Sequence, residues 1–199
     1  MAKLLLIVPK MFSKEDLGRI DPEIPEDFGE KRLQFWSYVR EKLRSVPRIT
    51  RIYYDSLTEE FEKDPLEFVK GDNQECFEIV SELLSEGAKL EVTEDKISVA
   101  ESRAWAEVAS KGDASALSLL AQSLEERNKK VAEKISQSLG EGEVSVFFVS
   151  PSRKIASQFD TRGIKAITIQ PFDPLDYVNS WLVSLQLRKS QKKAEGVKS

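Results

Sequence analysis

The chain contains no histidine, and this absence excludes more functions than any residue that is present implies. Histidine is the usual general base near neutral pH and the commonest metal ligand. Ser-His-Asp triads, Cys-His nucleophiles and His-ligated zinc or iron are therefore excluded. Cysteine is nearly absent too, because Cys76 stands alone. A single thiol forms no intrachain disulfide, CxxC pair or cysteine-rich metal site, and it is typical of a reducing cytoplasm.

Long apolar runs are also missing. The longest, residues 4–8, is far too short to span a bilayer, and the residues before it lack the features of a signal peptide. We therefore expect a cytoplasmic protein with no membrane partner. A composition of 40% hydrophobic and 32% charged residues favours a soluble globular chain. The mixed runs of Glu and Lys would also suit the surface ion-pair networks of a thermophile.

Basic residues are concentrated at the end of the chain. Residues 188–199 contain five Lys or Arg against one Glu, whereas the whole chain has a net charge of -4. The body is therefore acidic and repels phosphate backbones, so nucleic-acid binding is disfavoured unless this segment provides it. We predict a single α/β domain over residues 1–187 and a basic, disordered tail over residues 188–199.

Apolar runs alternate with helical periodicities along the chain. Residues 4–8 and 144–149 are apolar at almost every position, as expected for strands covered on both faces. Further strands are expected at 49–54, 88–92 and 166–169. Helices are expected at 33–46, from 73 to the glycine at 87, at 98–110, 117–139 and 154–159, and around 178–185. Right-handed crossovers would assemble these elements into a three-layer α/β fold, with a mainly parallel sheet of about five strands and helices on both faces.

In such sheets ligands bind outside the carboxyl ends of the strands. Polar side chains follow each expected strand of this chain. Hydrophilic loops are normal at these positions in any α/β protein, but as a converging set they predict a ligand site. The candidate ligand-binding residues are Lys10, Asp16, Asp55, Glu94, Asp95, Arg127, Ser150, Ser152 and Arg153.

Two chemistries could use this set. Its carboxylates could hold Mg²⁺ or Mn²⁺ and activate water for hydrolysis without histidine. Alternatively, Lys10, Arg153 and Lys154, with the hydroxyls of Ser150 and Ser152, could hold a small anion through charge and hydrogen bonds. No glycine-rich phosphate fingerprint is present. We assign no catalytic residue, no metal and no cofactor from the sequence.

Several of these residues also have a purely structural interpretation. Asp16 fits a helix-capping pattern. Cys76, on an apolar stripe, fits a small core residue better than a nucleophile. Trp36 and Trp181 lie on helical periodicities that indicate core packing, although an exposed apolar face around them would support a homodimer. Arg127 interrupts the apolar stripe of its helix, where it either faces solvent or pairs with a buried carboxylate.

Short motifs along the chain carry a resemblance to a known family. They are Pro9-Lys10-Met11-Phe12-Ser13-Lys14-Glu15-Asp16-Leu17-Gly18, Tyr54-Asp55-Ser56-Leu57, Glu86-Gly87-Ala88-Lys89-Leu90 with Thr93-Glu94-Asp95, and Glu126-Arg127-Asn128 ahead of residues 142–149. In this order they resemble a little-characterised α/β family that is distantly similar to the TraB, Tiki and haem-uptake-like proteins.

The family pattern also contains histidines that this chain lacks. One would fall at Phe12, after the first strand, and another at Ser152 or Arg153, after the fourth. Metal-dependent proteolysis and haem ligation, which the wider group implies, are therefore not carried over. The resemblance implies a divergent member that keeps the scaffold and an acidic pattern with one arginine. These residues are Asp16, Asp55, Glu94, Asp95 and Arg127.

Three functions follow as hypotheses. The favoured one is a non-catalytic binding module for a small anionic ligand or a protein partner, since it fits the missing histidines. The first alternative is an Mg²⁺- or Mn²⁺-dependent hydrolase that uses the strand-end carboxylates. The second alternative is nucleic-acid binding through the basic segment at residues 188–199.

Overall fold

The computed structural model describes residues 2–196. Five strands form one sheet in the order β3-β2-β4-β1-β5, and all neighbouring strands are parallel. The strands are β1 (Lys3–Pro9), β2 (Arg51–Tyr54), β3 (Lys89–Glu91), β4 (Val144–Val149) and β5 (Ile164–Thr168). The helices are α1 (Lys14–Ile20), α2 (Phe28–Arg44), α3 (Pro65–Asp72), α4 (Gln74–Ser85), α5 (Lys96–Ser110), α6 (Ala114–Ser138), α7 (Ser157–Asp160) and α8 (Pro174–Gly196), with a 3-10 helix, η1 (Glu59–Phe61).

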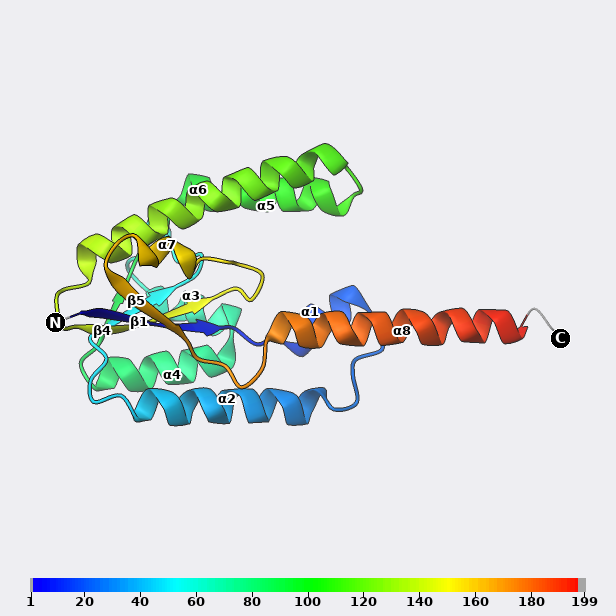
Figure 1. Ribbon diagram of the computed structural model, residues 1–199, viewed down its shortest axis with the longest axis horizontal. Helices are drawn as coiled ribbons and strands as arrows, with labels where there is room; N and C mark the ends of the chain where they lie inside the picture. Colours follow the sequence, from blue (N-terminus) through cyan, green and yellow to red (C-terminus); the bar gives the residue numbers. More distant parts are fainter. Residues whose placement is uncertain (1, 197–199) are drawn as a thin grey trace.

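Helices cover both faces of this sheet, which confirms the predicted three-layer α/β fold. Figure 1 shows α2 and α4 on one side of the strands and α6 and α7 on the other. Alternate strand residues enter two separate cores, because successive side chains of a strand point to opposite faces. Phe148 packs in the core beneath α2 and α4, and its neighbour Phe147 packs in the core beneath α6 and α7.

Local signals in the sequence fix several element boundaries. Asn73 caps α4, since its side chain accepts a hydrogen bond from the Cys76 backbone N–H at 3.0 Å. After α4 the chain turns through Gly87, whose φ of 95° lies in the left-handed region that glycine adopts without strain. These signals place the cap and the turn where the sequence predicts them.

Some expectations about helix faces were wrong. Two of the expected helices begin at Leu33 and Leu117 because these residues fit an apolar, inward-facing stripe, yet they are 70% and 58% exposed. Helix α2 begins earlier, at Phe28, and its buried face runs through Phe28, Phe35 and Trp36, so Leu33 falls outside it. Helix α3 was not predicted, because a helix of eight residues carries little periodicity.

Two tryptophans lie inside the monomer. Trp36 and Trp181 are 3% and 7% exposed and belong to the core beneath α2 and α4. Their burial in the chain's own core removes the argument for a homodimer that an exposed apolar face would have provided.

The end of the chain differs from the disordered tail that the charge pattern predicted. Residues 188–196 continue α8 as a helix, which suits a segment made mostly of good helix formers, with Lys the commonest. Lys189 on this helix contacts Asp21 at 2.5 Å. Residues 197–199 of the predicted tail lie outside the described residues.

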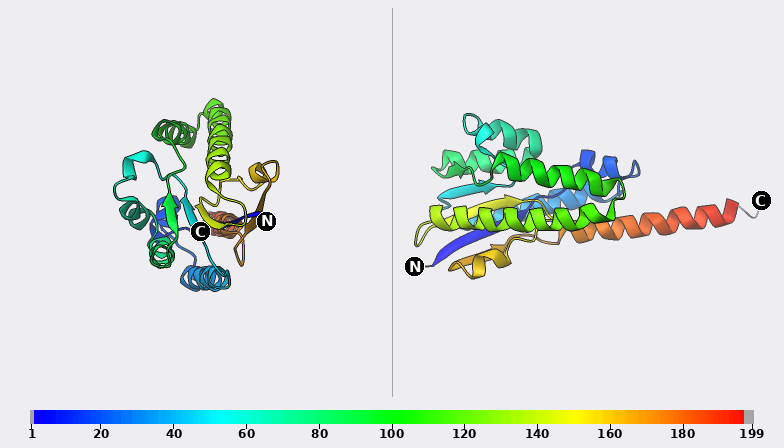
Figure 2. Two further views of the ribbon diagram at one scale, coloured as in Figure 1. Left: turned by 90° about the vertical axis from the view of Figure 1, so that its left-hand side faces the viewer. Right: turned by 90° about the horizontal axis from the view of Figure 1, so that it is seen from above.

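Two helical projections extend past the carboxyl edge of the sheet. Figures 1 and 2 show the antiparallel pair α5–α6 on one side and α8 on the other. Within residues 2–196, no helix combines the length and the apolar character needed to cross a membrane.

A buried charge network at the carboxyl edge of the sheet

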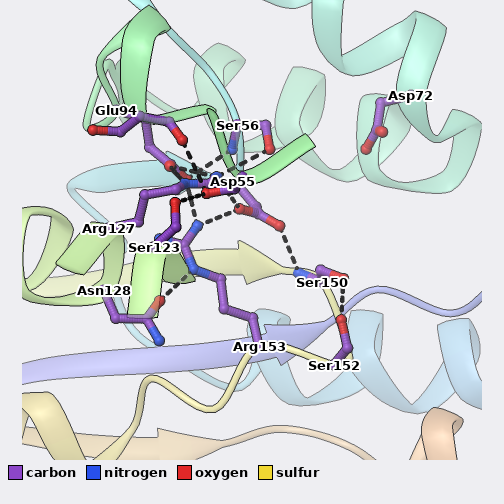
Figure 3. A network of polar contacts seen from close by, with 12 residues as sticks. Asp55, Ser56, Asp72, Glu94, Ser123, Arg127, Asn128, Ser150, Ser152 and Arg153 are labelled. Atoms are coloured by element: carbon purple, nitrogen blue, oxygen red, sulfur yellow. Dashed lines mark hydrogen bonds and ion pairs between the residues drawn. The ribbon is translucent and has the colours of Figure 1, made fainter. Parts of the chain in front are cut away.

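Four charged side chains from three loops and one helix meet at the carboxyl edge of the sheet. Asp55 follows β2, Glu94 follows β3, Arg153 follows β4, and Arg127 comes from the middle of α6. Their side chains are between 1% and 7% exposed. Figure 3 shows them pointing toward one another. Because β2, β3 and β4 are parallel neighbours, residues that follow them are brought together at one edge.

Both carboxylates in this network bind guanidinium groups. Nη1 of Arg153 donates to Oδ1 of Asp55 and to Oε1 of Glu94. Arg127 contacts Oε2 of Glu94 through Nε at 2.8 Å and through Nη2 at 2.5 Å. Its Nη2 also lies 3.6 Å from Oδ1 of Asp55. Two positive and two negative charges therefore neutralise one another in a site that water hardly reaches.

Backbone and amide groups complete the network. The Ser150 N–H donates to Oδ2 of Asp55 at 3.0 Å, and the Ser56 N–H donates to Oε1 of Glu94 at 2.9 Å. Asn128 accepts from Nε of Arg153 at 2.5 Å and donates to the backbone carbonyl of Lys154 at 3.3 Å. All four carboxylate oxygens thus have partners, and the loop after β4 is held against α6.

Ser56 carries backbone strain at this edge. Its φ of 65° lies in the left-handed region, which few non-glycine residues occupy. Its N–H bond to Glu94 and the contact of its Oγ with Nη2 of Arg127 at 3.4 Å are the interactions that favour this conformation. Such strain clusters at functional sites, because the surrounding structure must compensate for it.

The network holds Asp55 ionised. Burial would raise the pKa of Asp55, but the positive charges of Arg153 and Lys10 outweigh it and hold the pKa well below its usual value. A carboxylate that is ionised and bonded at both oxygens is a poor general base, because no lone pair faces a substrate proton. The network therefore acts as a structural support and as a fixed electrostatic environment.

Lys10 forms a second ion pair at the same edge. Its Nζ lies 2.6 Å from Oδ2 of Asp72 and 4.6 Å from the centre of the Tyr54 ring. Burial would lower its pKa, but Asp55 and Asp72 raise it above its usual value, so the amine stays charged and is no nucleophile.

Cys76 belongs to the core, as predicted, and is 0% exposed. Its burial raises the pKa of the thiol, so the thiol stays protonated and is no nucleophile.

Two predicted site residues serve as helix caps instead of joining the network. Asp16 and Ser13 form a capping box at the start of α1. Asp95 caps α5 by accepting the Ser98 N–H at 2.8 Å. Capping uses the carboxylate oxygens that were expected to bind a ligand. Ser152 lies nearer, since its hydroxyl bonds that of Ser150 at 3.2 Å, but it does not touch the carboxylates.

Three residues at this edge were not predicted from the sequence. Asn128 next to Arg127 interrupts the same apolar stripe, and this pair of polar residues was the signal that could have revealed it. Ser56 carried no signal, because its conformation follows from tertiary contacts. Asp72, which Figure 3 shows apart from the network, could not be found because α3 was not predicted.

A hollow of about 250 Å³ adjoins the network. It lies outside the carboxyl ends of β1, β4 and β5, where the loop after β4 passes over the sheet. Its polar lining residues include Ser150, Arg153, Lys154, Thr168 and Gln170. Nη2 of Arg153 is buried and has no hydrogen-bond partner among the described residues. A buried donor without a partner is unfavourable, and the residue that carries it lines the hollow.

The fold and the site define a class: a three-layer α/β protein whose sheet edge carries a neutral, fully buried charge network beside a polar hollow. No family model, curated protein or solved structure matches the chain, so no relative assigns a role to these residues and the TraB-like resemblance stays an expectation.

The depressed pKa of Asp55 predicts acid sensitivity. In the unfolded chain this carboxyl has its ordinary pKa of 3.8, whereas in the native protein its pKa is lower. Around pH 4 the unfolded chain therefore binds a proton here that the native protein does not bind. The stability from this group is therefore complete above that pH and is lost as the pH falls toward the lower native pKa. We expect Asp55→Asn to flatten the decline in the free energy of unfolding below about pH 4, measured by urea unfolding. The exposed Asp160→Asn is the control and should decline like the natural chain; equal slopes for Asp55→Asn would contradict the prediction.

Proposed function

We propose that this protein is a non-catalytic binding module for a small anionic ligand, held in the hollow beside the charge network. The observation that carries the proposal is the buried and unpartnered Nη2 of Arg153, a residue that lines the hollow. Arginine is well suited to carboxylate and phosphate oxygens, because its planar group donates several hydrogen bonds in fixed directions.

The surroundings of the hollow also favour an anion. Lys154 lines it with an exposed side chain that has no ion pair or hydrogen bond among the described residues. Ser150, Thr168 and Gln170 add hydroxyl and amide donors. Asp173, the acidic residue of the lining, already accepts the Leu175 N–H at 2.8 Å as a cap of α8. The charged group of the lining that is left without a partner among residues 2–196, the Lys154 ammonium, is therefore positive.

The network itself argues against the metal-dependent hydrolase. A cation bridging Asp55 and Glu94 would need the position that Nη1 of Arg153 takes, because that nitrogen bonds both carboxylates. Binding Mg²⁺ there would require displacing a buried guanidinium and leaving it without its partners, which is strongly unfavourable.

The cysteine content supports a cytoplasmic setting for the module. The single thiol, Cys76, is buried and forms no intrachain disulfide.

Titration calorimetry with inorganic phosphate and with succinate tests the proposal. We expect saturable binding of at least one anion, weakened about tenfold in Lys154→Ala, because a charge-assisted hydrogen bond contributes about 1.5 to 3 kcal/mol. The matched control is Lys165→Ala, an exposed lysine on β5 that does not line the hollow. Its affinity should equal that of the natural chain.

The outcomes separate the proposal from nonspecific attraction. Equal weakening by Lys154→Ala and Lys165→Ala would show that only net charge matters, and it would overturn the assigned location. Absence of saturable binding for both anions at millimolar concentration would overturn the function.

A further inference from the structure

A second cavity, of about 480 Å³, lies at the opposite edge of the sheet. It is formed where α2 and α4 end and where the following loop enters β2. Ion pairs such as Arg40–Glu78 and Arg44–Glu82 hold the two helices side by side, and both end near the amino ends of the strands in Figure 1. Its volume falls in the range of small-molecule sites.

The floor of this cavity is apolar. Leu43, Ile49, Ile79 and Leu83 line it, and each is between 3% and 7% exposed. These residues belong to the core beneath α2 and α4, so the cavity opens directly onto packed hydrophobic side chains. An apolar group of a ligand placed here would be removed from water on that side.

The rim carries one unpaired charge of each sign. Arg40 and Arg44 are committed to glutamates of α4. Arg48 and Glu86 also line the cavity, and neither has an ion pair or hydrogen bond from its side chain within the described part of the chain. The cavity therefore presents a free guanidinium and a free carboxylate around an apolar floor.

The carboxyl ends of α2 and α4 add partial negative charge near Glu86. The carboxyl termini of α2 and α4 both face this edge, and a helix carries partial negative charge at that end. Cations are therefore favoured near Glu86, which is the C-cap of α4. Arg48 lies beyond the end of α2 and provides the positive counterpart.

We propose that this cavity binds a free apolar α-amino acid. Its carboxylate would pair with Arg48, its ammonium with Glu86 and the adjacent helix end, and its side chain would lie against Leu43, Ile79 and Leu83. A zwitterion pairs with both Arg48 and Glu86. A fatty acid would pair with Arg48 alone, and an alkylamine with Glu86 alone. This site is separate from the anion site at the carboxyl edge and does not depend on it.

Calorimetry with L-leucine and two truncated analogues tests this proposal. Leucinamide lacks the carboxylate, and 4-methylpentanoate lacks the ammonium group. We expect saturable leucine binding and about tenfold or greater weakening for each analogue, since each loses one charge-assisted contact. Arg48→Ala should lose the preference for leucine over leucinamide, and Glu86→Gln should lose the preference for leucine over 4-methylpentanoate.

Control variants establish the location. Arg103→Ala and Glu62→Gln change exposed charges outside the cavity and should leave leucine binding unaltered. Val46→Trp should fill the cavity and abolish binding, with circular dichroism used to verify the fold. Lys154→Ala should have no effect, which separates this result from that of the anion site. No saturable leucine binding, or equal binding of leucinamide to the natural chain, would overturn the proposal.

Discussion

Replacing Arg153 with alanine is expected to lower the free energy of unfolding by about 3 to 5 kcal/mol. Its side chain is 3% exposed and its Nη1 bonds Asp55 and Glu94. Removing it leaves two buried carboxylates that share Arg127, and the partner of Asn128 disappears as well. Since small domains are stable by only about 5 to 15 kcal/mol, the loss would be visible at once in chemical denaturation.

A matched substitution and a compensated variant sharpen this test. Arg103→Ala removes an exposed arginine of α5 and should change stability by less than about 0.5 kcal/mol. Adding Asp55→Asn to Arg153→Ala should recover part of the loss, because the uncompensated negative charge is removed. If Arg153→Ala matched the Arg103→Ala control, the network would contribute nothing to the fold.

Phe148→Ala is expected to lower the free energy of unfolding by about 3 to 5 kcal/mol, because it removes core packing and leaves a void. Phe148 is 0% exposed in β4, and its ring lies 6.1 Å from that of Tyr54. Truncation leaves a void between β2, β4 and the helices above them, and rigid neighbours cannot close it. The Tyr54 hydroxyl donates to Asp72 at 2.6 Å, so movement of that ring would also disturb the Lys10–Asp72 pair.

Urea unfolding measures this effect, with Ile167→Ala as the control. Ile167 lies on β5 and is 37% exposed, so its truncation should cost about 1 kcal/mol or less. The urea dependence of unfolding should stay unchanged, which would show that stability and not compactness has altered. A loss for Phe148→Ala no larger than that of Ile167→Ala would contradict the packing of α2 and α4 on this face.

The central strands β1 and β4 were predictable because they are covered on both sides. Continuous apolar runs such as residues 144–149 cannot remain in water and can be read without any partner. Short elements such as α3 and η1 were not predictable, since they contain too few residues to show a period. Leu33 shows the same limit within a helix, because which apolar residue faces inward depends on where the helix docks.

The site was predictable in part. Asp55, Glu94 and Arg153 were found because parallel strands bring their following residues to one edge, and Arg127 because it interrupts an apolar stripe. Asp16 and Asp95 follow strands too, but the sequence did not distinguish a carboxylate that caps a helix from one that enters a network. That choice depends on whether the next helix begins within hydrogen-bond reach.

The sequence by itself determined the layered α/β architecture and the absence of histidine and disulfide chemistry, because hydrophobic pattern and residue inventory are properties of the chain alone. Only the tertiary structure decided that two arginines neutralise two acids in a buried cluster, that Ser56 is strained, and that Arg48 and Glu86 are left unpaired on one cavity. These features depend on the positions and directions of side chains from distant segments, which the order of residues does not specify locally.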